Sequence, residues 1–196
     1  RDSSTSRGLG DVYKRQVMRL TLRILSLLLV LSVTGTALGA SQRKVPAYEK
    51  YIKQYSSLAI QHQKKYRIPA SITLAQGLLE SGAGRSELAR KSNNHFGIKC
   101  HSDWRGGRVY HDDDLRGECF RKYKNPEQSY EDHARFLVDR PRYASLFKLK
   151  ITDYKGWARG LQKCGYATDR AYANRLIKLI EDYDLYPVSY THLRAH

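Results

Sequence analysis

The stretch from Pro69 to Gly84, PASITLAQGLLESGAG, constrains the fold of this chain more than any other segment. A proline at its start suits the first turn of a helix, where the missing N–H costs no intrahelical hydrogen bond. Glycines at its end suit the left-handed conformation in which many helices stop. Between them, four apolar residues recur at helical spacing: Ile72, Ala75, Leu78 and Leu79. The pattern predicts a helix, ended by Gly82 and Gly84, whose apolar stripe packs in the core.

Glu80 lies in the last turn of this predicted helix, directly after Leu78 and Leu79. The negative end of the helix dipole and burial among apolar neighbours both disfavour a carboxylate, so both raise the pKa of a glutamate there. A Glu that stays protonated near neutral pH can donate a proton to a leaving oxygen. A surface Glu near a helix end fits the same spacing, so the position alone leaves both interpretations open.

The two ends of the 196-residue chain differ from its middle. Near the N-terminus, an apolar run, LSLLLVLSV, follows two arginines and precedes small residues. This order is typical of a secretory signal peptide, predicted here over residues 18–40, and the run is short for a membrane span. Residues 1–17 and 188–196 continue no periodic pattern and are predicted to be a non-native leader and tail. The remaining residues, 41–187, are long enough for one domain with its own core.

The formal net charge of +16 bears on the partner of this protein. Because a signal peptide directs the chain out of the cytoplasm, nucleic acid is not expected as a partner. An anionic polymer or surface of the cell envelope is favoured instead. Charge that only keeps the protein soluble is the alternative.

The chain has three cysteines, Cys100, Cys119 and Cys164. An exported protein meets oxidising conditions, so a disulfide is expected, and Cys100 and Cys119 flank a turn-rich region that such a bond would close. Cys164 is then left as a buried small residue. The three histidines nearest to this region, at positions 95, 101 and 111, do not have the spacing of zinc ligands, so no metal or cofactor is predicted.

Apolar periodicity and turn residues predict helices, then a small β lobe, then helices again. The fold class is α+β, mostly α. Asn125 is expected to cap the helix that follows the β lobe, with Pro126 in its first turn. The expected helices span residues 46–66, 69–81, 87–90, 126–139, 153–163 and 170–183, with a short turn or helix over 142–147 and hairpin strands near 108–111 and 118–123.

Three consecutive carboxylates, Asp112, Asp113 and Asp114, lie in the predicted β lobe. Glycoside hydrolysis needs an acid near the scissile oxygen and a second group that stabilises an oxocarbenium-like centre or activates water. The aspartates are candidates for that second group, although a solvated turn or a cation site would explain them as well. In a strand, Asp113 would share one face with Val109 and His111.

Several motifs in order resemble the glucosaminidase family of bacterial wall hydrolases, glycoside hydrolase family seventy-three, which includes flagellar muramidase-type domains and autolysins. The matching motifs are LLESGAGRSELA, SNNHFGIK, FRKY, SYEDHARFL, PRY and GYATDRAYANRLIKLIE. Together they cover about Tyr48 to Tyr186. The LES motif alone is shared with lytic transglycosylases, so the order of the motifs makes the resemblance specific.

The resemblance implies a lysozyme-like fold and cleavage of the β-1,4 bond between N-acetylglucosamine and N-acetylmuramic acid in peptidoglycan glycan strands. Glu80 matches the catalytic proton donor of the family. The second carboxylate of the family is usually a Glu in the β lobe, where this chain has Asp. Asp113 aligns best, with Asp112 and Asp114 as alternatives, and the shorter side chain leaves retention or inversion of configuration open.

The resemblance also suggests residues that bind the sugar. Tyr166 in GYATD matches a cleft tyrosine that would orient the substrate or its N-acetyl group, unless it is a buried Tyr with a satisfied hydroxyl. Asn94, Phe96 and Gly97 match the cleft floor, or else form a structural loop. Trp104 would stack on a sugar ring or pack inside the β lobe. A lytic transglycosylase and a non-catalytic basic wall-binding module remain the alternative functions.

Overall fold

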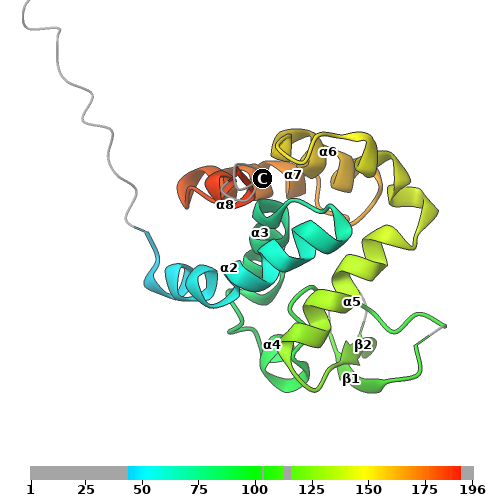
Figure 1. Ribbon diagram of the computed structural model, residues 1–196. Coiled ribbons are helices and arrows are strands. Elements are labelled where there is room, and N and C mark those ends of the chain that lie inside the picture. Colours follow the sequence, from blue (N-terminus) through cyan, green and yellow to red (C-terminus); the bar gives the residue numbers. More distant parts are fainter. Residues whose placement is uncertain (1–43, 103, 113–115, 191–196) are drawn as a thin grey trace, which may run out of the picture. The chain divides into compact units, whose positions relative to one another are not determined.

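The computed structural model describes residues 44–102, 104–112 and 116–190. The leader and signal peptide predicted over residues 1–40 lie outside these ranges. Within them the chain is mostly helical and carries one two-stranded antiparallel sheet, which confirms the predicted fold class (Figure 1). The elements are α2 (Pro46–Tyr66), α3 (Ala70–Ser81), α4 (Glu87–Ser92), β1 (Gly107–His111), β2 (Glu118–Lys122), α5 (Pro126–Val138), the 3-10 helix η1 (Pro141–Lys148), α6 (Tyr154–Lys163), α7 (Tyr172–Asp182) and α8 (Tyr186–Tyr190).

Helix α3 is the predicted helix of the Pro69–Gly84 stretch, and it lies at the centre of the domain. It packs against α2, α6, α7 and α8, and every residue from Ala70 to Leu78 is buried. The predicted apolar stripe was therefore too narrow, because a helix surrounded by four others buries its polar residues too, among them Thr73 and Gln76. A Cβ atom at Gly77 would lie 2.5 Å from the Tyr51 hydroxyl oxygen, so this glycine permits the close approach of α2.

Several helix starts agree with the caps expected from the sequence. Asn125 Oδ1 accepts a hydrogen bond from the backbone N–H of Gln128 at 3.0 Å, and Pro126 opens α5. Ser86 caps α4 and Asp153 caps α6 in the same way. Helix α3 ends at Gly82, which adopts the left-handed conformation with a φ of 55°. These boundaries follow from local hydrogen bonding, which is why the sequence predicts them.

In α2 the most buried aromatic residues are Tyr51 and Tyr55, whereas Tyr48 and Tyr66 are half-buried because they lie at the edge of the packed face. The chain does not leave the fold after α7: α8 follows it, and Ser189 is 2% exposed. The origin of residues 188–196 stays a prediction, but the first three of them belong to α8.

The β lobe is a hairpin in which Val109 faces Phe120 and His111 faces Glu118. A disulfide joins Cys100 to Cys119, the pair expected from the sequence, with their Cα atoms 5.3 Å apart. Cys164 is half-buried and its thiol is free. The disulfide ties the loop before the hairpin to strand β2.

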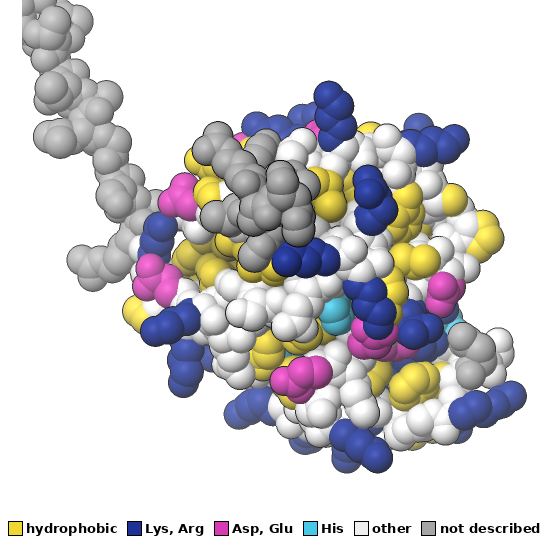
Figure 2. Space-filling model, in the orientation of Figure 1, with side chains coloured by type: hydrophobic (Ala, Val, Ile, Leu, Met, Phe, Trp, Pro, Cys, Tyr) yellow, Lys and Arg dark blue, Asp and Glu magenta, His cyan; other side chains and the backbone are white. Residues whose placement is uncertain are grey.

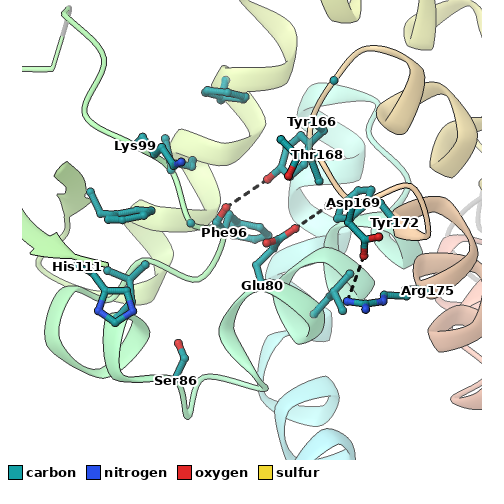
Figure 3. A pocket seen from close by; sticks show the side chains of 18 of the residues that line it. Glu80, Ser86, Phe96, Lys99, His111, Tyr166, Thr168, Asp169, Tyr172 and Arg175 are labelled. Carbon is teal, nitrogen blue, oxygen red and sulfur yellow. Dashed lines mark hydrogen bonds and ion pairs between the residues drawn. The ribbon is translucent and has the colours of Figure 1, made fainter. Parts of the chain in front are cut away.

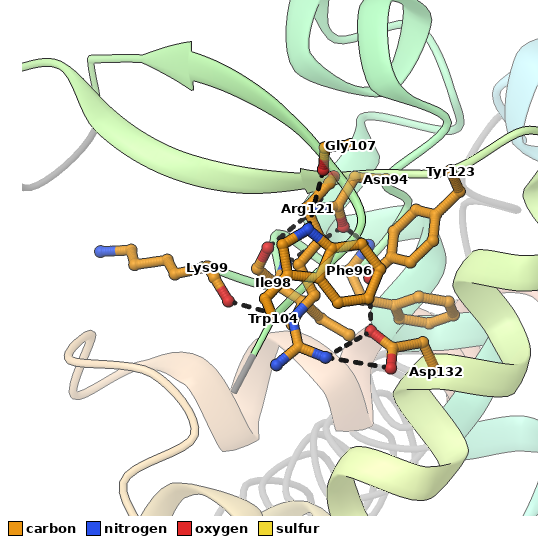
Figure 4. Close-up of polar contacts among 9 residues, drawn as sticks. All are labelled: Asn94, Phe96, Ile98, Lys99, Trp104, Gly107, Arg121, Tyr123 and Asp132. Carbon is orange, nitrogen blue, oxygen red and sulfur yellow. Dashed lines mark hydrogen bonds and ion pairs between the residues drawn. The ribbon is translucent and has the colours of Figure 1, made fainter. Parts of the chain in front are cut away.

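An ion pair fastens the hairpin to α5 (Figure 4). Arg121 is 5% exposed, and its Nη1 atom lies 3.1 Å from both carboxylate oxygens of Asp132. The Tyr123 hydroxyl donates to Asp132 Oδ2 at 2.6 Å. The ring of Trp104 covers the Arg121 guanidinium, whose central carbon is 4.6 Å from the ring centroid. The β lobe therefore has a fixed position relative to α5.

Buried histidines should make the fold sensitive to acid. Burial lowers the pKa of His95 to about 4 and that of His133 to about 3. Since the unfolded chain binds these protons at a pKa of about 6.5, their contribution to stability is complete above that pH and is lost as the pH falls toward 4. We expect the free energy of unfolding to fall by about 1.4 kcal/mol per pH unit for each histidine in this window. Denaturant titrations at pH 7, 5.5 and 4 measure this slope, and equal midpoints at the three values would contradict it.

The surface agrees with the basic composition of the chain. On the face shown in Figure 2, Lys and Arg side chains are scattered over both the edge and the middle and are not gathered in one patch. No helix in the described ranges combines the length and the apolarity needed to cross a membrane.

Candidate active site

A pocket of about 550 Å³ opens beside the C-terminal end of α3. The β lobe and α4 contribute Lys99, His111 and Ser86 on one side, and the α6–α7 loop contributes Tyr166 and neighbouring residues on the other (Figure 3). This size lies within the roughly 300–1,000 Å³ that small-molecule sites occupy. Segments far apart in the sequence thus meet around one cavity.

Glu80 lines this pocket from the last turn of α3. The side chain is half-buried, and its Oε1 atom accepts a hydrogen bond from the Tyr172 hydroxyl at 2.8 Å. Leu79, Phe96 and Tyr166 are part of the same wall. The helix C-terminus and the apolar, aromatic environment both disfavour the charged form of Glu80, whereas the hydrogen bond from Tyr172 favours it.

Two tyrosines form the wall next to Glu80. The rings of Tyr166 and Tyr172 stack with centroids 5.7 Å apart, and the Tyr166 hydroxyl donates to the Phe96 carbonyl oxygen at 3.4 Å. Burial, and secondly the charge of Glu80, raises the pKa of both phenols well above their ordinary value. Both hydroxyls are therefore neutral hydrogen-bond donors at physiological pH. The resemblance predicts Tyr166 in the cleft, but nothing in the sequence indicates that Tyr172 reaches it.

The loop residues expected on the cleft floor divide into two groups. Phe96 and Gly97 line the pocket. Asn94 does not; it is 1% exposed, and its amide nitrogen donates to the carbonyl oxygens of Ile98 and Arg121 at 2.9 and 3.0 Å. Because its polar atoms are used inside the protein, Asn94 holds the loop to the β lobe, and the structural alternative applies to it (Figure 4).

Trp104 also lies away from Glu80. It lines a second pocket of about 500 Å³ between α2 and α5, and its Nε1 atom donates to the Gly107 carbonyl oxygen at 2.8 Å. Its ring packs on Arg121 and against Tyr123. The packing alternative therefore describes Trp104 better than sugar stacking beside Glu80.

The three aspartates predicted as candidates for a second catalytic group follow His111 in the sequence. Asp112 is exposed, and its Oδ1 atom accepts a hydrogen bond from the Gly117 N–H at 2.7 Å, so it stabilises the turn of the hairpin and does not line the pocket. Asp113 and Asp114 lie outside the described residues. His111, directly before them, does line the pocket, so this end of β1 reaches the site.

The sequence analysis missed a further acidic residue of the pocket, Asp169. One of its carboxylate oxygens lies 3.3 Å from a guanidinium nitrogen of Arg175, and its Oδ1 atom accepts from the Ala171 N–H at 2.8 Å. The signal was its place in GYATD, three residues after Tyr166. Across the described part of the chain, no three His, Cys, Asp or Glu side chains come together as a metal site.

Comparisons with known proteins agree with this arrangement. Residues 56–185 match the family model "Glucosaminidase: Mannosyl-glycoprotein endo-beta-N-acetylglucosaminidase". The exo-glucosaminidase LytG of Bacillus subtilis is 33% identical over 192 residues, which cover 88% of this chain and 66% of LytG. The peptidoglycan hydrolase FlgJ of Vibrio parahaemolyticus is 32% identical over 147 residues, which cover 69% of this chain and 47% of FlgJ. The chain thus spans between about half and two thirds of these relatives.

Solved structures give the same family. The peptidoglycan hydrolase of Sphingomonas sp. A1 superposes with a TM-score of 0.63 and 32% identity, covering 75% of this chain and 96% of that one. The catalytic domain of the autolysin Auto of Listeria monocytogenes does so with a TM-score of 0.61 and 32% identity, covering 78% and 93%. From its sequence motifs, its lysozyme-like fold and these matches, the chain belongs to the glucosaminidase family of glycoside hydrolases.

Proposed function

We propose that this protein is an exported peptidoglycan hydrolase of the cell envelope, an endo-β-N-acetylglucosaminidase. It cleaves the β-1,4 bond between N-acetylglucosamine and N-acetylmuramic acid, with Glu80 as the general acid. The observation that carries the proposal is the position of Glu80, half-buried at a helix C-terminus in an aromatic-lined pocket. Relatives named as peptidoglycan hydrolases support the choice of polymer, and the predicted signal peptide supports export.

In this proposal the reaction proceeds by acid catalysis at the glycosidic oxygen. Glu80 transfers its proton to that oxygen while the bond from C1 breaks, and water then adds to the oxocarbenium-like carbon while a carboxylate of the site takes the proton that this water loses. Tyr166 orients the sugar or its N-acetyl group. The second group is an aspartate of the 112–114 segment, with Asp113 preferred, or the N-acetyl group of the substrate itself.

Basic side chains in the same pocket favour an anionic polymer. Lys99, Arg142 and Arg175 line it together with Glu80 and Asp169. Peptidoglycan carries carboxylates on its stem peptides, so cations around the site would attract it.

The chemistry of the product ends tests the proposal. The purified full chain is incubated with purified peptidoglycan, the products are reduced with borohydride, and the ends are identified by mass spectrometry. We expect new reducing N-acetylglucosamine ends that arise from cleavage of internal bonds of the glycan strands. Anhydromuramyl ends would instead identify a lytic transglycosylase, and reducing N-acetylmuramic acid would identify a muramidase. Release of single terminal sugars would indicate exo action, and wall binding without product would indicate a binding module.

A further inference from the structure

Behind Glu80, three buried side chains form a hydrogen-bond chain that ends on its carboxyl group. His133 Nε2 lies 3.1 Å from Gln76 Oε1, and Gln76 Nε2 donates to the Tyr172 hydroxyl oxygen at 2.9 Å. The Tyr172 hydroxyl in turn donates to Glu80 Oε1 at 2.8 Å. His133 and Gln76 are 0% exposed and Tyr172 is 3% exposed. The chain therefore lies in a region of low polarity, where each hydrogen bond is strong and its direction matters.

The hydrogen bonds from His133 to Glu80 can run in two directions of donation, because an amide group can rotate by half a turn and an imidazole has two neutral tautomers. In one direction, His133 Nε2–H donates to Gln76, the Gln76 amide N–H donates to Tyr172, and Tyr172 donates to Glu80. In the other, a protonated Glu80 donates to Tyr172, Tyr172 donates to the Gln76 oxygen, and Gln76 donates to His133. Only the first leaves Glu80 as an acceptor at Oε1.

The second ring nitrogen of His133 selects the direction. His133 Nδ1 is buried and has no hydrogen-bond partner. A buried N–H without an acceptor is rarer and more costly than an acceptor without a donor, so Nδ1 is the nitrogen without hydrogen. The hydrogen is then on Nε2, which requires the Gln76 oxygen to face His133 and its amide nitrogen to face Tyr172.

Packing keeps this imidazole in place and neutral. The His133 ring lies flat on Phe96, with centroids 3.9 Å apart and an angle of 14° between the planes. Burial, and secondly the charge of His62, lowers the pKa of His133 to about 3, so its tautomer does not change across the physiological range. His133 Nε2–H therefore remains the hydrogen-bond donor to Gln76 throughout the physiological pH range.

We propose that His133 and Gln76 are positioning residues, which fix the Tyr172 hydroxyl as a donor to Glu80 Oε1 and so place the transferable proton of Glu80 on Oε2. This inference deepens the proposed function and rests on it. A proton whose position is set before the substrate arrives needs no reorganisation when the glycosidic oxygen comes into place. Of the three residues in this hydrogen-bond chain, only Tyr172 lines the pocket together with Glu80. Gln76 and His133 act on Glu80 through Tyr172.

Other titratable groups also surround Glu80 and act on it electrostatically. They come from the β lobe, η1, the α6–α7 loop and α7. The titratable side chains that line its pocket are Lys99, His101, His111, Arg142, Tyr166, Asp169, Tyr172 and Arg175.

The pH dependence of the reaction tests the inference. In Tyr172→Phe the carboxylate form of Glu80 loses a hydrogen-bond donor. The alkaline limb of the pH profile of kcat/KM should therefore shift to higher pH by roughly one pH unit. In His133→Phe the Gln76 amide can turn and take the Tyr172 proton, so a smaller shift in the same direction is expected. The double variant should match Tyr172→Phe alone, because His133 acts only through Tyr172.

Two further variants separate positioning from packing. Tyr130→Phe removes the buried hydroxyl that donates to Tyr51 at 2.8 Å, outside this chain, and should leave the limb in place. If His133→Phe does not fold, Gln76→Met breaks the same connection with a side chain of similar size and should give the same shift. The inference would be overturned if folded His133→Phe or Gln76→Met kept the wild-type alkaline limb. It would also be overturned if the shifts of His133→Phe and Tyr172→Phe added in the double variant.

A second readout does not depend on activity. The carboxyl carbon of Glu80, labelled with carbon-13 and assigned by its loss in Glu80→Gln, can be titrated by NMR. The pKa of Glu80 should rise in Tyr172→Phe and in His133→Phe relative to wild type. An inactive wild-type protein that still shows this rise would refute the proposed function but not the hydrogen-bond chain, whereas an unaltered titration would refute the chain.

Discussion

Replacing Glu80 with glutamine should lower the release of reducing ends from purified peptidoglycan by roughly 10²- to 10⁴-fold, the contribution expected of a general acid. The amide has the same shape, and its oxygen can still accept the Tyr172 hydroxyl at the position of Oε1. It cannot supply an acidic proton to the leaving oxygen. The loss should therefore appear in the rate while the fold is retained, which circular dichroism and a denaturant titration would show.

Glu49→Gln is the matched control for this substitution. Glu49 is exposed in the first turn of α2 and lines neither pocket of the described structure. Its change to glutamine removes the same charge from the protein and should leave the rate within about twofold of wild type, since surface substitutions of this kind have small effects. A folded Glu80→Gln protein that keeps more than about a tenth of the wild-type rate would exclude Glu80 as the acid, because a general acid contributes more than that.

Removing the carboxylate of Asp132 should cost about 3–5 kcal/mol of unfolding free energy, because it leaves a buried charge without its partner. Arg121 is 5% exposed, and in Asp132→Ala its guanidinium would lose this carboxylate while the Trp104 ring and the Lys99 carbonyl oxygen stay beside it. The Tyr123 hydroxyl would lose its acceptor as well. Chemical denaturation of wild type and variant measures the loss.

An exposed ion pair on α4 is the control for this prediction. Glu87 and Lys91 are 54% and 63% exposed and are four residues apart on one helix. Glu87→Ala should lower the unfolding free energy far less than Asp132→Ala does, because exposed ion pairs contribute little to stability. Equal losses in the two variants would mean that the Arg121–Asp132 pair does not fix the β lobe to α5.

The features that the sequence predicts well are those decided by neighbouring residues. The cap at Asn125, the glycine end of α3 at Gly82 and the hairpin between β1 and β2 all follow from short-range hydrogen bonds and turn preferences. The position of Glu80 at a helix end is one of these local features. For this reason the sequence places Glu80 at a helix end, and the family motif around it then makes it the candidate acid.

The features that the sequence does not predict depend on contacts between distant segments. Tyr172 and Glu80 are 92 residues apart, and no periodicity in α7 indicates that the hydroxyl of a core tyrosine reaches the pocket. Asn94 has the composition of a binding residue, but its amide is consumed by Ile98 and Arg121. The Trp104 ring packs on the Arg121 guanidinium, which belongs to the same β lobe. In each case tertiary packing decides between two roles that the residue type permits equally.

The disulfide between Cys100 and Cys119 makes the β-lobe segment a covalent ring closed over a sequence separation of 19. The Asp112–Asp114 candidates lie inside that ring. A protease that cuts the backbone once between the two cysteines would leave both new ends attached to the same molecule. Gel electrophoresis would then separate two fragments only after the disulfide is reduced. The segment that carries the aspartates would stay attached to the protein.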